Sequence, residues 1–201
     1  MIFVVEDDTS MREALVGLFE SVGLDASAFG SVPEFLGGKI TDCPSCLVLD
    51  VRLPGMSGLD LQAHLAQANI QMPIVFITGH GDIPMTVKAI KAGAIEFLTK
   101  PFRDQDLLDA VRQGLDTDRA RRRQLRSVAD LRVRFETLTP REQQVITLVS
   151  TGLMNKQIAG ELGVTEITVK VHRANAMRKM GAKSLANVIK MVQELGAHDA
   201  A

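Results

Sequence analysis

The sequence predicts an α/β domain followed by an all-α domain. Over roughly the first 115 residues, short apolar segments alternate with segments of helical spacing. This alternation is typical of a doubly wound parallel sheet that is covered by helices on both faces. Beyond residue 137 the apolar positions keep helical spacing, which predicts a four-helix domain. The net charge also changes sign between these two parts of the chain.

Each expected strand is a short apolar run, and the five runs span 2–5, 25–29, 46–49, 73–77 and 94–98. Helices are expected between them over about 9–22, 31–36, 58–68 and 82–92. A fifth helix opens at Arg103. Thr9 and Ser10 are an N-cap signal for the first helix, and Gly23 ends it. The result is a five-stranded parallel sheet.

Polar side chains stand where these strands end. Glu6 and Asp7 follow the first strand, Asp50 ends the third, Thr78 ends the fourth, and Lys100 follows the fifth. The carboxyl ends of parallel strands meet at one rim of such a sheet, so we expect these five residues to converge. Clustered carboxylates attract a hard divalent cation, and Mg²⁺ suits both oxygen ligands and a phosphoryl donor.

The convergence points to phosphoryl transfer. Asp50 is a carboxylate nucleophile that would form an acyl phosphate. Lys100 can neutralise the new charge, and the Thr78 hydroxyl can hydrogen-bond a phosphoryl oxygen. Taken singly, Asp50 could be a loop carboxylate, Lys100 a surface charge and Thr78 a helix cap. Their joint arrangement favours the chemical interpretation.

Residues 1–116 resemble the receiver domain of two-component response regulators, which has a flavodoxin-like fold. The matching segments are the acidic pair after the first strand, DVRLPGMSG, ITGHGD and FLTKPF. The resemblance implies that Asp50 is the phosphoacceptor, assisted by Thr78 and Lys100. It also implies that Thr78 and Phe97 are a coupled switch pair; a simple core role for Phe97 is the less favoured alternative.

The same resemblance implies a bound Mg²⁺ or another divalent cation. Its ligands would be Asp7, Glu6, Asp50 and the backbone carbonyl of Arg52. Glu6 stands where the family more often has Asp, and its longer side chain alters how it reaches the metal. A cis peptide bond is expected before Pro101.

The second half of the chain is basic. Up to Asp116 the chain holds 8 Lys and Arg against 16 Asp and Glu, and from Thr117 onward it holds 15 against 8. A basic domain suits a polyanion such as DNA. We expect a receiver domain over 1–116, a helical, arginine-rich linker over 117–136 and a DNA-binding domain over 137–201. The linker could be a plain spacer or a short coiled-coil contact between subunits.

The DNA-binding domain contains a helix-turn-helix pattern. Its helices are expected over about 140–150, 156–162, 165–180 and 184–195, with N-caps at Thr139, Asn155, Thr165 and Ser184. Gly163 makes the tight turn, and the helix after it is the expected reading helix. The segments LTPRE, GLMNKQIAGELG and TVKVHRANAMRKM resemble the NarL/FixJ (LuxR-type) output domain.

The reading helix has two stripes. One stripe should pack on the preceding helix at Ile158 and Leu162, and it holds Val169, His172, Ala176 and Met180. The opposite stripe, its flanks and the preceding helix supply the expected DNA contacts, which are Lys156, Thr165, Ile167, Thr168, Lys170, Val171, Arg173, Ala174 and Arg178. Basic side chains suit phosphates, and small or apolar ones suit thymine methyl groups.

Other features favour structural roles. Cys43 and Cys46 form a lone CxxC, and we interpret Cys46 as a buried small hydrophobe. His64 and His80 lack partners at ligand spacing. The apolar side of the last helix, from Leu185 to Leu195, could serve the domain core alone or also pair two subunits.

No apolar run approaches membrane-spanning length, and the start lacks a basic n-region, so we expect a cytoplasmic protein without a signal peptide. The first strand begins almost at Met1, which suggests that a few native residues precede it.

These observations predict a transcription factor that a sensor histidine kinase activates by phosphorylating Asp50. Phosphorylation would favour a homodimer, free or align the domain that binds double-stranded DNA, and allow contact with RNA polymerase. No catalysis is expected beyond phosphotransfer to Asp50 and its slow autodephosphorylation. The rivals are a phosphohydrolase and a ligand-sensing regulator that needs no phosphate. The sequence leaves open the signal, the kinase, the operator, the regulated genes, the sign of regulation and any autoinhibition.

Overall fold

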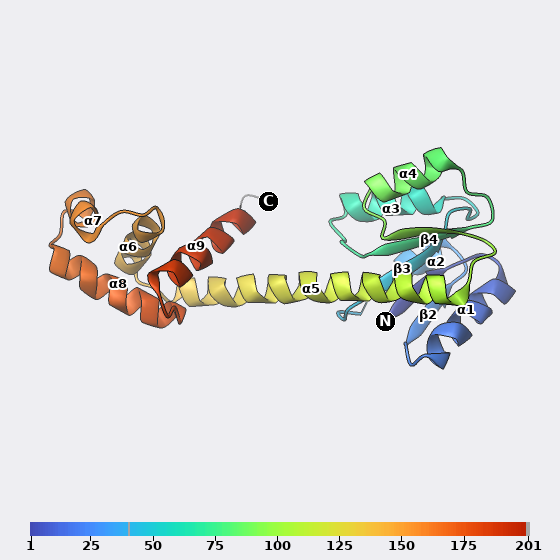
Figure 1. Cartoon of the computed structure of the whole chain (residues 1–201), viewed down its shortest axis with the longest axis horizontal. Helices are drawn as coiled ribbons and strands as arrows, with labels where there is room; N and C mark the ends of the chain where they lie inside the picture. Colours follow the sequence, from blue (N-terminus) through green and yellow to red (C-terminus); the bar gives the residue numbers. More distant parts are fainter. Residues whose placement is uncertain (40, 200–201) are drawn as a thin grey trace. The chain divides into compact units, whose positions relative to one another are not determined.

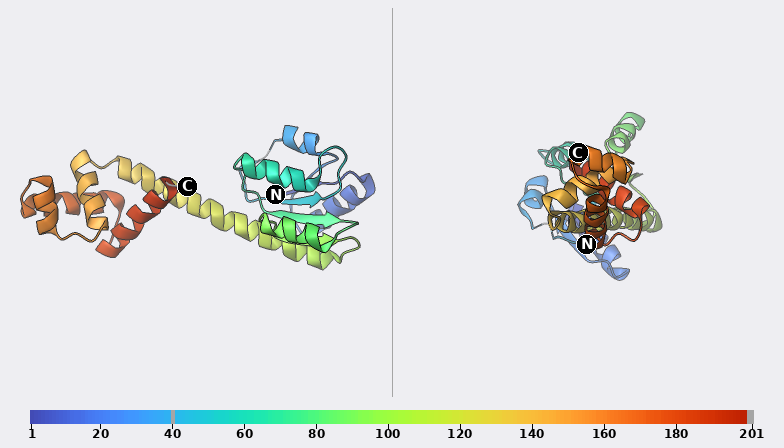
Figure 2. Two further views of the ribbon diagram at one scale, coloured as in Figure 1. Left: turned by 90° about the horizontal axis from the view of Figure 1, so that it is seen from above. Right: turned by 90° about the vertical axis from the view of Figure 1, so that its left-hand side faces the viewer.

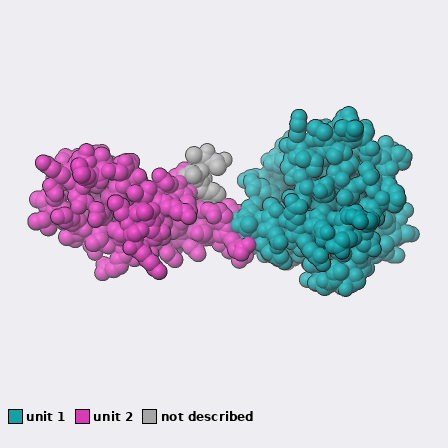
Figure 3. Space-filling view, viewed as in Figure 1, with its two compact units in different colours: residues 1–122 teal, residues 123–201 magenta. Residues whose placement is uncertain are grey.

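The structure is a computed structural model that describes residues 1–39 and 41–199, with side chains through residue 196. The chain forms two compact units, Met1–Arg122 and Arg123–Ala201 (Figure 3). The expected linker, 117–136, is therefore shared between the two units. Residues 200–201 of the expected DNA-binding domain lie outside the described residues.

The first unit is built on the expected parallel sheet. Its strands are β1 (Ile2–Val5), β2 (Ala26–Phe29), β3 (Cys46–Asp50), β4 (Ile74–Thr78) and β5 (Glu96–Thr99), in the order β2-β1-β3-β4-β5. All four pairings are parallel. Every residue of β1, β3 and β4 is buried, which explains why these strands read as continuous apolar runs. The predicted fold class is confirmed.

Helices cover both faces of the sheet (Figure 1). They are α1 (Thr9–Ser21), α2 (Val32–Gly37), α3 (Gly58–Gln67), α4 (Ile83–Lys91) and the long α5 (Asp104–Glu136). Alternate strand residues feed two cores: Phe3 and Phe76 pack with α2, α3 and α4, whereas Val4 and Val75 pack with α1 and α5. Helices α3 and α4 lie side by side (Figure 2), and Gln62 donates a hydrogen bond to the Ala89 carbonyl between them.

The second unit contains α6 (Pro140–Ser150), α7 (Asn155–Leu162), α8 (Glu166–Met180) and α9 (Leu185–Asp199), and the end of α5 packs on them. Thr139 caps α6 through a capping box with Glu142. Gly163 ends α7 in the left-handed conformation, with φ of 65°, and so makes the turn into α8. The predicted helix-turn-helix is confirmed.

Two cap predictions were wrong. Asp8, rather than Thr9 or Ser10, is the N-cap of α1, and its carboxylate accepts the Met11 N–H at 2.7 Å. Met154, rather than Asn155, precedes the first residue of α7, and its N–H donates to the Gln157 side chain. At α1 three capping residue types stand in a row, and the folded backbone decides among them; at α7 Met154 is not a capping residue type, and the Gln157 side chain accepts its N–H instead.

Helix α5 supplies apolar residues to both cores. Leu108, Val111 and Leu115 are buried in the first unit, and Val128 and Leu131 in the second. These side chains are the ones that a coiled-coil interpretation would assign to a subunit contact. Among the described residues of α5, the exposed large apolar side chains are Leu125 and Val133. Little apolar surface of α5 is therefore left exposed for a coiled-coil contact between subunits.

A buried carboxylate ties α5 to the loop before β3. Asp118, with a side chain 1% exposed, accepts hydrogen bonds from the Ser45 backbone N–H at 2.9 Å, from Arg121 Nε at 3.0 Å and from Arg122 Nε at 2.7 Å. Arg122 also pairs with Asp42. Burial alone would raise the pKa of Asp118, but these donors outweigh it and hold the pKa below its usual value.

Replacing Asp118 by Asn should destabilise the first unit by about 2 kcal/mol, because a buried acceptor of charged hydrogen bonds is lost. Asp116→Asn is the matched control: Asp116 lies two residues before Asp118 on the same helix and pairs with Arg119, but its side chain is 74% exposed, so a change under about 0.5 kcal/mol is expected. Urea unfolding followed by NMR at the amides of β3 measures both.

The effect of Asp118→Asn should depend on pH. A carboxyl whose pKa is lower in the folded than in the unfolded chain contributes fully above about pH 5, and the contribution is lost as the pH falls below about 4. An effect that is equal for the two substitutions, or that grows as the pH falls, contradicts this account.

Candidate phosphoacceptor site and nucleic-acid interface

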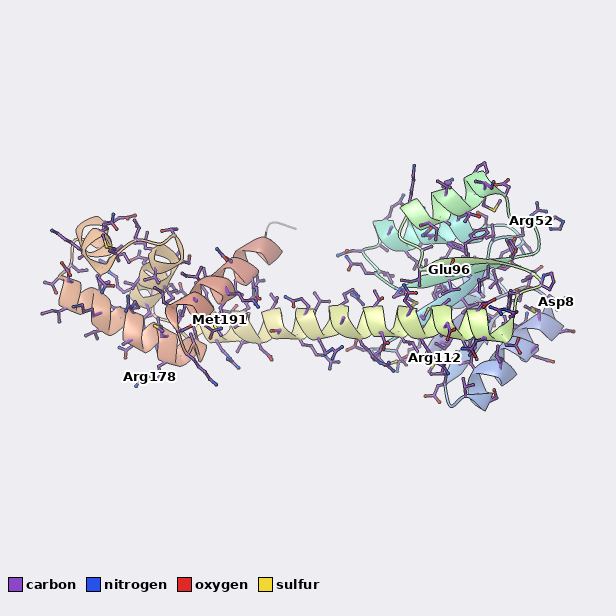
Figure 4. All side chains as sticks on the ribbon, in the orientation of Figure 1. Asp8, Arg52, Glu96, Arg112, Arg178 and Met191 are labelled. Carbon is purple, nitrogen blue, oxygen red and sulfur yellow. The ribbon has the colours of Figure 1, made fainter. Side chains whose placement is uncertain are left out.

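The polar residues at the strand ends converge as predicted from the sequence. Asp50 is the last residue of β3, Glu6 and Asp7 follow β1, and Lys100 follows β5. These strands end at the same rim of the sheet because their pairings are all parallel. Figure 4 labels two neighbours of these residues, Asp8 and Arg52, at the same right-hand edge of the first unit.

Lys100 bridges two carboxylates from different strands. Its Nζ lies 2.6 Å from Glu6 Oε2 and 2.7 Å from Asp50 Oδ2. The other Asp50 oxygen, Oδ1, accepts the Arg52 backbone N–H at 2.9 Å. Glu6 is 1% and Asp50 6% exposed, so both carboxylates are shielded from solvent on most sides.

The pKa values of Glu6 and Lys100 are both raised, for different reasons. Desolvation raises the pKa of Glu6, with help from the negative charge of Asp50, and the hydrogen bond from Lys100 only partly offsets it. For Lys100, desolvation would lower the pKa, but the hydrogen bonds to Asp50 and Glu6 outweigh it and raise the pKa. Lys100 therefore remains an ammonium ion between the two carboxylates at neutral pH.

The carboxylates also suit a divalent cation. One oxygen each from Glu6, Asp7 and Asp50 can be chosen so that all three lie within 4.8 Å of one another, and Asp7 is exposed to solvent. Oxygen ligands in this number fit Mg²⁺, which keeps several waters in such sites. No histidine or cysteine among the described residues joins this cluster. The expected role of the Arg52 carbonyl stays a prediction, as do the individual ligand roles.

The two expected switch residues, Thr78 and Phe97, lie in the neighbouring strands β4 and β5. Thr78 ends β4 and is fully buried, and its carbonyl accepts the Lys100 N–H at 2.7 Å. Its hydroxyl accepts the His80 N–H at 3.3 Å. Phe97 is buried beside Phe76, with ring centroids 6.0 Å apart. Their coupled movement remains a prediction.

Two backbone features hold the loops of the site. The bond between Lys100 and Pro101 is cis, as expected. Gly58, the first residue of α3, packs directly behind Asp50: a Cβ at Gly58 would lie 2.3 Å from the Asp50 carbonyl oxygen. The Gly58 N–H donates to the Val51 carbonyl at 3.0 Å, so this approach is fixed by the backbone itself.

In the second unit, α8 presents the expected reading face. Ile167 is 74% and Val171 53% exposed, although both are apolar. The flanking residues Lys156, Thr165, Lys170, Ala174 and Arg178 are also exposed, whereas Thr168 and Arg173 are half-buried. Figure 4 labels Arg178 on the outer side of α8. The contacts with DNA themselves stay predictions.

The opposite stripe of α8 anchors it in the core. Val169, Ala176 and Met180 are buried with Ile158, as predicted, while His172 is half-buried. Arg173 donates to the Asn155 side chain at 3.1 Å, which ties α8 to the start of α7. That contact gives Arg173 a structural role in addition to the predicted phosphate contact.

Sequence reasoning missed an ion pair that positions α8. Glu142 is buried at the start of α6 and accepts a hydrogen bond from Lys179 Nζ at 2.6 Å. The hydrogen bond from Lys179 lowers the pKa of Glu142, as does the Thr139 N–H. Helical periodicity cannot reveal such a pair, because its partners are far apart in the chain.

The remaining predictions concern side chains outside both sites. Cys46 is fully buried, and desolvation raises the pKa of its thiol to about 12, so the structural interpretation holds. Both cysteines are free thiols. In α9, Val188 and Leu195 are buried in the core while Leu185 is exposed. None of the helices in the described part of the chain combines the length and the apolar character needed to cross a bilayer.

Comparison with known proteins agrees with both halves of the structure. Residues 2–112 match the response regulator receiver domain family, and residues 136–192 match the bacterial regulatory proteins of the luxR family. Nodulation protein W of Bradyrhizobium diazoefficiens is 62% identical over 196 residues, covering 98% of this chain and 86% of that protein. The transcriptional regulatory protein FixJ of Azorhizobium caulinodans is 40% identical over 190 residues, 94% and 90% of the two chains. The solved structure of the response regulator StyR matches with a TM-score of 0.82 at 53% identity, covering 96% and 98%.

The fold, the acidic rim and the helix-turn-helix together define a response regulator, a DNA-binding transcription regulator of two-component systems. The chain belongs to the NarL/FixJ family of such regulators. Receiver domains generally use Mg²⁺, and response regulators of this kind work with a sensor kinase and with DNA.

Replacing Gly58 by Ala should destabilise the first unit by about 2 kcal/mol, because the new methyl group overlaps the Asp50 carbonyl. Gly17→Ala is the control. Gly17 lies inside α1, where a Cβ would have nothing within 4 Å, so alanine should stabilise the helix by about 0.5–1 kcal/mol. Urea unfolding measured at receiver amides tests the pair, and equal effects at the two positions would contradict the close approach.

Proposed function

We propose that the protein is a cytoplasmic transcription regulator that is switched on when a sensor histidine kinase phosphorylates Asp50. The observation that carries this proposal is the arrangement around Asp50, in which Lys100 holds one carboxylate oxygen and the Arg52 N–H holds the other. A carboxylate at a sheet rim, with a fixed cation on one side, is suited to accept a phosphoryl group.

The proposed transfer is a nucleophilic substitution at phosphorus that brings a charged phosphoryl group into the site. An oxygen of Asp50 attacks the phosphorus of a phosphohistidine on the kinase; the P–N bond breaks as the new P–O bond forms, and the imidazole leaves with the electron pair. Lys100 lies 2.7 Å from Asp50 and can follow the charge onto the phosphoryl oxygens. A Mg²⁺ ion held by Asp7, Glu6 and Asp50, with the Arg52 carbonyl, would screen the negative charge of the incoming phosphoryl group.

The proposed output is dimerisation and DNA binding. The movement of Thr78 and Phe97 would change the surface around α4, where Ile83 is 81% exposed and Val87 and Ile90 are exposed beside it. Exposed apolar side chains grouped on one helix support a subunit contact there. A dimer would place its two α8 helices on a two-fold DNA site. Bound there, the dimer could contact RNA polymerase. The only chemistry proposed is phosphotransfer to Asp50 and its slow autodephosphorylation.

Asp50→Asn should abolish labelling by a phosphorylated histidine kinase or by acetyl phosphate, because an amide cannot form the acyl phosphate. Phosphate incorporation measured on a Phos-tag gel or by intact-protein mass spectrometry tests this. Asp109→Asn, which changes an exposed carboxylate of α5, is the control and should be labelled normally. Continued labelling of the Asp50 variant refutes the assignment of the site.

Lys170→Gln should weaken DNA binding uniformly across sequences, because the exposed Lys170 side chain is expected to contact a phosphate. The slope of log affinity against log salt concentration should fall by about 0.9 for one lost phosphate contact. Lys190→Gln on α9, where the lysine is 76% exposed and pairs with Glu194, should leave the slope unchanged. Footprinting or fluorescence anisotropy with and without phosphodonor gives both readings, and an unchanged slope for Lys170→Gln removes this residue from the interface.

A further inference from the structure

The side chain of Arg12 fastens the loop that carries the cation-binding carboxylates. Its guanidinium NH1 donates to the carbonyl oxygen of Glu6 at 2.8 Å and to that of Asp7 at 3.2 Å, and NH2 donates to the Thr9 hydroxyl at 3.2 Å. Arg12 lies in the first turns of α1 and is half-buried. One planar group therefore holds two consecutive carbonyls of the loop.

These two carbonyls depend on Arg12. Among the described residues, no backbone N–H donates to the carbonyl of Glu6 or of Asp7. The loop is fixed on either side of them: the Glu6 N–H donates to the Phe29 carbonyl at 3.1 Å, and Asp8 caps α1. Arg12 thus holds the backbone carbonyls in the middle of the loop, while Lys100 and the Asp8 backbone contact the Glu6 carboxylate.

We propose that Arg12 is a positioning residue for the divalent-cation site. It does not contact the cation; it fixes the backbone of Glu6 and Asp7 so that their carboxylates face Asp50. This inference rests on the proposed function, because it assumes that the acidic cluster binds a cation. Groups that hold metal ligands in place commonly affect metal affinity about 10–100-fold when they are removed.

Charge and positioning make opposite predictions, and this makes the inference testable. Arginine carries a positive charge, so its charge alone opposes cation binding nearby, and Arg12→Gln would then tighten the binding of Mn²⁺. If Arg12 positions the loop, the same substitution weakens binding. Arg12→Lys keeps the charge but replaces the planar fork by a point donor, so positioning predicts weaker binding for this variant too.

The experiment is a titration of the full-length protein with Mn²⁺, in which electron paramagnetic resonance measures the free aqueous ion. Arg12→Gln should weaken binding about tenfold, and Arg12→Lys should weaken it severalfold. Arg112→Gln is the matched control: Arg112 lies on α5, labelled in Figure 4, where it pairs with Asp109 at the surface, and its loss should change nothing. Circular dichroism reports whether each variant folds, and Arg12→Lys decides the question if Arg12→Gln does not.

A second measurement, the Mg²⁺ dependence of Asp50 labelling, separates loss of ligand positioning from a general loss of structure. With acetyl phosphate as donor, Arg12→Gln should need about tenfold more Mg²⁺ for half-maximal labelling of Asp50 but should reach the normal rate when Mg²⁺ is saturating. Binding of Mn²⁺ by both Arg12 variants that equals or exceeds that of the wild type overturns the inference. The variant Asp7→Asn distinguishes failure of the Arg12 inference from failure of the proposed function. If wild-type protein does not bind Mn²⁺, or if binding is unchanged in Asp7→Asn, the cation site itself is overturned.

Discussion

The ion bridge from Lys100 to Glu6 and Asp50 is the interaction on which the rest of the receiver unit depends. Oxygens of the Glu6 and Asp50 carboxylates lie within 4.8 Å of each other. Two unit charges at about 5 Å repel each other by roughly 3 kcal/mol at an effective dielectric constant of about 20, and the adjacent cation offsets this repulsion at a buried rim. The bridge requires β1, β3 and β5 to end at the same edge, and the parallel strand order provides that. It also places a cation beside Asp50, the carboxylate nucleophile of the proposed reaction.

Helix α5 connects this site with the DNA-binding unit through covalent continuity and through packing. Its first half is buried against the sheet, and Gly114 permits an approach so close that a Cβ there would lie 2.6 Å from Cys46 Sγ. Asp118 then fixes the helix to Ser45, directly before the strand that carries Asp50. Further along, Val128 and Leu131 enter the core of the second unit. The arginine-rich stretch is thus part of both cores, which its composition did not suggest.

The sequence predictions succeeded where a residue's role follows from its position in a strand or helix, and failed where the role depends on which other residue it contacts. Strand-end residues such as Asp50 and Lys100 could be assigned because a parallel sheet brings all carboxyl ends to one rim. The cap of α1 was misplaced because three suitable residues, Asp8, Thr9 and Ser10, stand in a row there, and that of α7 because Met154 is not a capping residue type. Arg12 and Asp118 were missed because a basic or acidic residue on a helix is usually a solvated charge, and the sequence shows nothing of what it meets.

The sequence by itself determined the two-domain organisation, the parallel five-stranded sheet, the helix-turn-helix and the residue types at the rim of the sheet. Periodicity, glycine turns and charge are local properties of the chain and can be read without the fold. The tertiary structure alone decided which groups those residues meet. It set Lys100 between Glu6 and Asp50, placed Arg12 on the carbonyls of the loop, and buried Asp118 under the arginines of α5. Such contacts join residues far apart in the chain or depend on how the backbone turns, and only the packed fold fixes them.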